Sequence, residues 1–257
     1  WLISTNKVHF DMENMASCGV FVETPKVSAE EASVLIKGVV RNKDEDNKKL
    51  KLSNTILDRK GTIVSKEVIS LSIRKGESSP FSIQVKSKKK PNLWSPESPY
   101  LYTVETSILD AKTNTVIDKV VNPLGFRWFS FDADKGFYLN GKHYKLNGVC
   151  RHQDQQFLGS AVSEEQHRRD MQMIKDLGAN FIRISHYPQD DAILEQCDRL
   201  GLIAWEEITI VNYINLNKAF AESRESQLRE MIRQHYNHPS IVTCGYMNEI
   251  MLGTLKN

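Results

Sequence analysis

Polar and apolar residues alternate along the first half of the chain, up to about Asn122. The alternating runs are rich in β-branched and aromatic residues, and turn-forming clusters such as residues 42–47 separate them. The runs cover residues 19–25, 33–40, 50–57, 66–73, 81–85 and 101–108. A period of two with turn signals at this spacing is typical of antiparallel strands. The pattern predicts a two-sheet β-sandwich of the immunoglobulin type.

From about Phe137 the period of the apolar residues changes. Residues 137–146 predict a hairpin, because Asn140-Gly141 at its tip is the strongest short turn signal. Beyond it, strand-like apolar runs alternate with amphipathic helical segments. The predicted strands are a first one that contains Cys150 and three more at residues 181–186, 202–207 and 241–247.

Three helices are predicted between these strands. The first begins at Ser163-Glu164-Glu165-Gln166, which has the spacing of a capping box, and ends at Gly178. The second runs from about Asp190 to Leu200 and stops at Gly201. The apolar stripe of the first helix is Met171, Ile174 and Leu177, and the third helix is lined by Leu228, Met231, Ile232 and His235.

Four strand-then-helix steps with short links imply right-handed parallel crossovers. This count predicts half of a (β/α)8 barrel, with an open doubly wound sheet as the structural alternative. A dinucleotide fold is disfavoured, since no Gly-x-Gly-x-x-Gly follows the first strand. We expect a linker remnant at residues 1–4, the sandwich at 5–122 and a truncated TIM-barrel half at 123–257.

Composition is that of an ordinary globular protein, with 257 residues, 40% of them hydrophobic and 26% charged. The net charge of +2 and the Lys86-Ser87-Lys88-Lys89-Lys90 run indicate a solvated loop and no nucleic-acid partner. No apolar stretch approaches the roughly 20 residues needed to span a bilayer, so no membrane partner is expected. The chain starts at Trp1-Leu2-Ile3 without Met, which suggests a piece of a longer protein. Its localisation is left as unknown: a soluble protein, with a periplasmic or secreted parent as candidates.

Four cysteines are widely spaced, without a Cys-x-x-Cys pair: Cys18, Cys150, Cys197 and Cys244. We interpret them as reduced and mostly buried thiols. Cys150 and Cys244 are candidates for a nucleophile by residue type alone. Because each lies inside an apolar strand, a packing role is the prediction for both.

Polar residues gather where the predicted parallel strands end, which is where barrel enzymes place their reacting groups. They are residues 151–154, Arg183, Ser185, His186, Tyr187, Glu206, Glu207, Asn248 and Glu249. Carboxylates, amides and imidazoles of this kind suit sugar hydroxyls, and the aromatic face of Trp205 suits sugar C–H surfaces. Glu249, directly after an apolar run and beside Asn248, is a candidate general acid/base, with a solvated surface acid as the alternative.

Two further readings stay open at this point. Arg183 within an apolar strand either pairs with Glu206 or Glu207 or contacts a substrate. The polar residues at the strand ends, called the rim below, could instead bind a metal ion. Neither His-Glu-x-x-His nor His-x-His occurs, however, and no metal is expected.

Several ordered motifs resemble glycoside hydrolase family 2, the β-galactosidase, β-glucuronidase and β-mannosidase family. They lie at residues 125–127, 137–142, 146–154, 173–188, 197–202 and 237–241 and at Asn248-Glu249, with a further match in the sandwich half at 93–102. The resemblance implies an immunoglobulin-like sandwich followed by about four β/α units of the catalytic TIM barrel.

The resemblance also implies a retaining exo-glycosidase. Glu249 would be the acid/base, Asn248 would hold the sugar 2-hydroxyl, and His152, Arg183 and His186 would line the −1 subsite. Glu207, at the end of the third predicted strand, is a further candidate for substrate binding. The nucleophilic Glu of the family lies on a later strand, so the fragment itself is expected to be inactive.

The expected substrate is a β-galactoside, which makes the parent a β-galactosidase with terminal non-reducing β-D-galactose as its target. The alternatives are a β-glucuronidase, a β-mannosidase, or a non-catalytic carbohydrate-binding or scaffold module. Some relatives place magnesium ligands where this chain reads Ile208-Thr209-Ile210-Val211-Asn212-Tyr213, so no cofactor is expected. The open half-barrel makes a homo-oligomer a further expectation.

Overall fold

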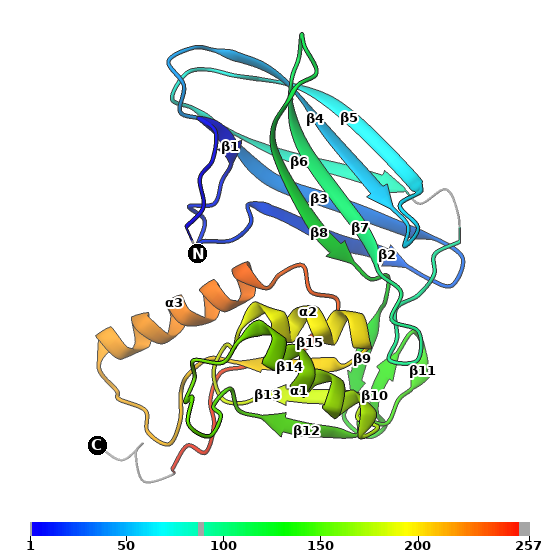
Figure 1. Cartoon of the computed structure of the whole chain (residues 1–257), viewed down its shortest axis with the longest axis vertical. Helices are drawn as coiled ribbons and strands as arrows, with labels where there is room; N and C mark the ends of the chain where they lie inside the picture. The colour runs from blue at the N-terminus through cyan, green and yellow to red at the C-terminus, as the bar shows by residue number, and fades with distance from the viewer. Residues whose placement is uncertain (1, 87–89, 252–257) are drawn as a thin grey trace. The chain divides into compact units, whose positions relative to one another are not determined.

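The computed structural model describes residues 2–86 and 90–251 (Figure 1). Most of the predicted lysine-rich loop lies outside the described residues. Contacts divide the chain into two compact units. The first takes in the chain up to Asn92, Leu101–Phe126 and Arg233–Asn237; the second takes in Leu93–Tyr100, Arg127–Ile232 and the chain from His238. The domain limits expected from the sequence, 1–4, 5–122 and 123–257, stay a prediction.

The first unit contains two antiparallel sheets, which confirms the predicted sandwich (Figure 1). In one sheet, β3 (Ala32–Asn42) pairs with β1 (Val8–Phe10), β2 (Val20–Val27) and β6 (Ser78–Lys86). The other has the order β5 (Ile63–Ile73), β4 (Lys48–Leu57), β7 (Tyr102–Asp110) and β8 (Val116–Leu124). The strands alternate because every second side chain enters the core. Core side chains exposed by 2% or less include Phe10, Val34, Ile36, Leu50, Leu52, Val104 and Ile108.

The second unit contains the predicted hairpin. A three-stranded antiparallel sheet has the order β11 (Lys142–His143), β10 (Gly136–Leu139) and β9 (Phe129–Asp132). Asn140 and Gly141 have φ values of 51° and 77°, as a tight hairpin turn requires.

A four-stranded parallel sheet carries the rest of the second unit. Its order is β12 (Gly148–Arg151), β13 (Phe181–Ile184), β14 (Ile203–Glu207) and β15 (Ile241–Gly245), which is also the order in the sequence. The helices α1 (Glu164–Asp176), α2 (Asp191–Leu200) and α3 (Lys218–Gln234) follow the first three strands (Figure 1). This is the part of a TIM barrel that the strand count predicted.

Apolar packing fixes α1 and α2 on one face of this sheet. Ile182, Ile184 and Ala204 of the strands share a core cluster with Met171 of α1 and Ile193 of α2. A second cluster joins Ile208, Ile210 and Met231, with Phe220 and Leu228 packed against it.

The caps of α1 and α2 agree with the sequence. Ser163 is the N-cap of α1, and its hydroxyl accepts a hydrogen bond from the backbone N–H of Gln166 at 3.3 Å. Gly201 ends α2 with a φ of 70°, a left-handed conformation that glycine adopts without strain. Helix α1 ends one residue before Leu177, and this leucine is 75% exposed, so its predicted place on the apolar stripe is wrong. Ile232 is also 40% exposed.

The cysteine prediction was half correct. All four cysteines are free thiols, but only Cys197 is buried, whereas Cys150 and Cys244 are exposed. Cys150 is in register with Arg183 and Trp205, on the sheet face opposite the core cluster, and Cys244 lies on β15, an edge of the described sheet. A position inside a strand therefore does not bury a side chain whose face or edge is uncovered.

None of the helices in the described residues combines the length and the apolar character needed to cross a bilayer.

Candidate active site

The carboxyl ends of β13, β14 and β15 bring three predicted rim residues into direct contact. Arg183 Nε donates to Oε1 of Glu207 at 2.6 Å, and Arg183 Nη2 donates to Oδ1 of Asn248 at 2.9 Å. The other oxygen of Glu207, Oε2, lies 2.8 Å from Nδ1 of His186. Four of the predicted site residues therefore form one connected polar cluster.

Register explains why these residues meet. Arg183 is opposite Trp205 on the neighbouring strand, and Glu207 lies two residues beyond Trp205, so both project to the same face of the sheet. The guanidinium carbon of Arg183 is 4.8 Å from the centre of the Trp205 ring. Glu206, one residue earlier, is in register with Ile184, whose side chain belongs to the helix-covered core. The partner of Arg183 is thus Glu207 and not Glu206.

Burial and charge set the state of this pair. The Glu207 side chain is 1% exposed, while that of Arg183 is 24% exposed. The hydrogen bond to Glu207 raises the pKa of Arg183 above its usual value, so the guanidinium stays charged. A buried carboxylate with a hydrogen-bonding partner on each oxygen is held in one orientation.

His152 lies beside this cluster. Its ring centre is 5.2 Å from that of His186, with the ring planes at 77°, and 6.1 Å from that of Tyr187. The hydroxyl of Tyr187 accepts a hydrogen bond from the backbone N–H of Gln153 at 3.1 Å. His152 is exposed and His186 is partly exposed, so both imidazoles are open to a ligand.

Asn248 is fixed by backbone contacts to the loop after β14. Its N–H donates to the carbonyl of Ile210 at 2.8 Å, and its carbonyl accepts from Asn212 at 3.1 Å. Asn248 is buried, and Glu249 follows it with a φ of 50° and an exposed side chain. Glu249 makes no hydrogen bond to another described residue. The predicted acid/base is therefore presented to solvent beside a fixed amide.

A pocket of about 520 Å³ opens on the same face of the sheet. Its lining includes Phe131, Phe181, Trp205, Tyr246 and Met247. Apolar and aromatic walls dominate this surface, and it adjoins the cluster through Trp205.

The described residues hold no group of three or more His, Cys, Asp and Glu side chains arranged to bind a metal ion. No cofactor is assigned to the site.

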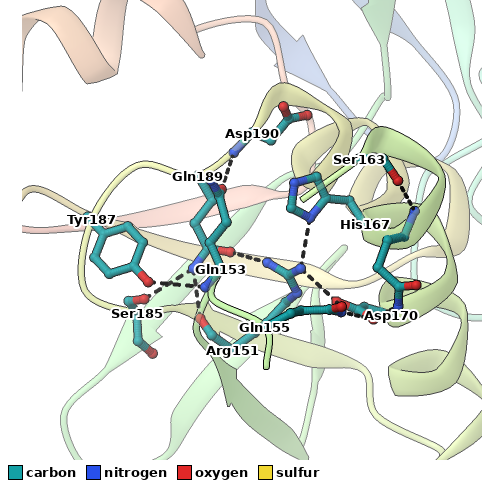
Figure 2. A network of polar contacts seen from close by, with 11 residues as sticks. Arg151, Gln153, Gln155, Ser163, His167, Asp170, Ser185, Tyr187, Gln189 and Asp190 are labelled. Carbon is teal, nitrogen blue, oxygen red and sulfur yellow. Dashed lines mark hydrogen bonds and ion pairs between the residues drawn. The ribbon is translucent and has the colours of Figure 1, made fainter. Parts of the chain in front are cut away.

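The sequence did not predict the side chains that contact Arg151 at the end of β12. His167 and Asp170 of α1 and Gln189 after Pro188 contact Arg151 (Figure 2). His167 and Asp170 are three residues apart on one helix, so they share a face, and that spacing was the available signal.

Two models of known protein families match the chain. A model described as "Glycosyl hydrolases family 2" matches residues 19–127, and one described as "Glycosyl hydrolases family 2, TIM barrel domain" matches residues 133–255. The chain belongs to glycosyl hydrolase family 2. The resemblance drawn from its motifs is confirmed.

Individual relatives agree with this assignment. A structure of Bacteroides uniformis β-glucuronidase 2 covalently bound to cyclophellitol-6-carboxylate aziridine is 50% identical, with a TM-score of 0.93 over 96% of this chain and 29% of that chain. A Bacteroides fragilis β-glucuronidase is 37% identical over 97% of this chain and 36% of its own length. A β-galactosidase of Bacteroides ovatus is 32% identical over 98% of this chain and 29% of its own length. The chain thus spans about a third of the length of the curated relatives it matches.

Proposed function

We propose that the protein containing this chain is a retaining exo-β-glycosidase that removes a terminal, non-reducing β-linked sugar. The observation that carries this proposal is the cluster of Arg183, Glu207, His186 and Asn248 at the strand ends, with the exposed Glu249 directly after Asn248. Fixed donors beside an accessible carboxyl group are what glycoside cleavage needs for sugar positioning and leaving-group protonation.

The contacts suggest how the sugar is held. Because Asn248 Oδ1 accepts from Arg183, its amide N–H groups remain available to donate to a sugar hydroxyl. His152 and His186 offer ring nitrogens on the neighbouring side of the rim. Hydrogen bonds that strengthen as charge develops in the transition state lower the barrier more than contacts of constant strength.

Glu207 was predicted to bind substrate, and the geometry favours a different use. Both of its oxygens are engaged, one by Arg183 and one by His186, and its side chain is 1% exposed. We infer that Glu207 orients these two side chains, and that the sugar meets Arg183 and His186 instead.

Glu249 is the proposed general acid and later the general base. A retaining mechanism requires a second carboxylate about 5 to 5.5 Å away as nucleophile. We propose that this group comes from outside the 257 residues.

The second part of the proposal concerns which sugar is removed. The sequence predicted a β-galactoside, but the relatives do not support this choice specifically. Of the three relatives described above, the two at 50% and 37% identity are β-glucuronidases and the one at 32% identity is a β-galactosidase. We propose a β-glucuronide as the substrate, with a β-galactoside as the second candidate.

The test compares nitrophenyl glycosides on the full-length protein. The expected result is a kcat/KM for the β-D-glucuronide that exceeds those for the β-D-galactoside and β-D-mannoside. A higher value for the galactoside would restore the first prediction. Loss of activity in Glu249→Gln but not in Glu165→Gln, an exposed acid of α1, would assign the hydrolysis to this site. No hydrolysis of any of the three glycosides would refute the proposed function.

A further inference from the structure

A buried polar network lies behind the rim, centred on Arg151 at the end of β12 (Figure 2). Arg151 Nη1 donates to Oε1 of Gln189 at 2.6 Å. Arg151 Nη2 donates to Oδ2 of Asp170 at 2.7 Å and lies 2.9 Å from Nδ1 of His167. Arg151 is 7% exposed, Gln189 8% and His167 0%. A guanidinium so buried cannot contact a sugar in the pocket.

The protonation states in the network are fixed by their surroundings. Burial raises the pKa of Asp170, but hydrogen bonds from Arg151 and Gln166 outweigh it and leave that pKa below its usual value. Burial and the charge of Arg151 lower the pKa of His167, so its imidazole is neutral. Since its Nδ1 faces a guanidinium N–H, Nδ1 accepts and the proton resides on Nε2. The network therefore contains one ion pair and neutral partners.

The same residues connect the ends of β12 and β13 through the backbone. The carbonyl of Arg151 accepts from Ser185 N–H at 3.1 Å and from Gln189 Nε2 at 2.8 Å. Gln189 Nε2 also donates to the carbonyl of Ser185 at 3.1 Å. One amide group thus joins the two segments that carry His152 and His186.

A second connection lies next to the first. Gln153 Oε1 accepts from Asp190 N–H at 2.8 Å, and Gln153 N–H donates to Tyr187 at 3.1 Å. His152 lies between Arg151 and Gln153, and His186 between Ser185 and Tyr187. Each histidine is therefore flanked on both sides by residues that take part in these connections.

We propose that Arg151 and Gln189 are positioning residues that set the geometry of His152 and His186 at the rim. The kinetic part of this inference rests on the proposed glycosidase function, and the structural part does not. Removing either residue would let the segments that carry His152 and His186 shift. A shift of about 1 Å from the productive geometry can cost about 100-fold in rate.

The discriminating variant is Gln189→Glu. It retains an oxygen acceptor for Arg151 Nη1 and removes the Nε2 donor that joins Arg151 to Ser185. Gln172→Glu is the matched control, since Gln172 is an exposed residue of α1 whose amide donates to Asp176 at 2.8 Å, outside the network. Asp170→Asn is a second test variant in case Gln189→Glu does not fold.

Two measurements test the inference. In the 257-residue chain, histidine-selective NMR should show the ring-proton signals of His152 and His186 shifted in Gln189→Glu and unchanged in Gln172→Glu. In the full-length protein, kcat/KM should fall by about 10- to 100-fold in Gln189→Glu, as a misplacement of up to about 1 Å would cause. The loss should be equal for good and poor leaving groups, because sugar positioning does not involve proton donation to the leaving group.

The outcomes separate this inference from the proposed function. If the unmutated protein cleaves no glycoside, the proposed function fails and the NMR comparison alone decides the positioning role. Unshifted histidine signals in folded Gln189→Glu and Asp170→Asn would overturn that role. A kcat/KM within twofold of the unmutated enzyme in both variants would overturn it as well.

Discussion

Arg183 donates its Nε–H to Glu207 at 2.6 Å, and the second oxygen of the same carboxylate lies 2.8 Å from His186. One buried acid therefore orients two candidate sugar-binding side chains. Because Glu207 is 1% exposed, it depends on these partners for the compensation that water gives to a surface acid. This dependence makes the pair sensitive to conservative substitution.

Arg183→Lys should lower both stability and activity. An ammonium group cannot donate to Glu207 and Asn248 in the planar geometry that the guanidinium provides. Arg183→Ala, which leaves Glu207 without its main partner, should lower the free energy of unfolding by about 3–5 kcal/mol. Urea denaturation of the 257-residue chain measures this change.

Arg168→Ala is the matched control for Arg183→Ala. Arg168 is exposed and pairs with Glu164 one turn away on α1, so its removal should cost no more than about 1 kcal/mol. Equal losses in the two variants would contradict the stabilising role of the Arg183–Glu207 pair.

Glu249→Gln in the full-length protein should reduce turnover by several orders of magnitude for glycosides with poor leaving groups. The loss should be much smaller for activated aryl glycosides, since only a poor leaving group needs the proton. Steady-state kinetics with a series of leaving groups measures this difference. A uniform loss across the series would remove the acid/base assignment.

The 257-residue chain is expected to hydrolyse no aryl glycoside. In the proposed mechanism the nucleophile comes from outside these residues, and one carboxylic acid without a nucleophile about 5 to 5.5 Å away cannot form the glycosyl-enzyme intermediate. Release of nitrophenol from the purified chain, abolished by Glu249→Gln, would show that this expectation is wrong.

The apolar face of the parallel sheet should cause the chain to self-associate. Phe131 and Tyr246 line its pocket and are each 58% exposed, and Met247 is 38% exposed. Apolar patches of this kind commonly become interfaces. Light scattering after gel filtration should show dimers or larger species, with less association in Phe131→Ser. Leu177→Ser, at a 75% exposed position just after the end of α1, is the control. A monomer at tens of micromolar would refute association.

Cys244 should react slowly with alkylating reagents although the residue as a whole is exposed. Burial of the thiol, together with the nearby charge of Glu206, raises its pKa to about 11. Since the thiolate is the nucleophile, its reaction at pH 8 should be roughly 100-fold slower than that of a thiol with a pKa near 9. Peptide mass spectrometry after timed alkylation gives the rate, with the denatured chain as the reference. A rate at pH 8 equal to that of the denatured chain would contradict the raised pKa.

Local structure and the order of the elements could be predicted from the amino-acid sequence. Alternation of apolar residues specified the sandwich, Asn140-Gly141 specified the hairpin, and Ser163 and Gly201 specified helix ends. Each of these signals acts over a few residues, because strand faces, turns and caps depend on neighbours in the chain. The motifs also identified the family, and they directed attention to the strand ends where Arg183, Glu207 and Asn248 meet.

Which side chains contact one another could be seen only in the folded structure. Glu206 and Glu207 are adjacent, and only the register of β14 against β13 selects Glu207 as the partner of Arg183. The hydrogen bond from Gln189 to Arg151 joins residues 38 positions apart, and no local sequence pattern predicts it. Cys150 became exposed for a related reason, since the burial of a strand residue depends on what covers its face. Partners and burial are long-range properties, which a short stretch of sequence does not encode.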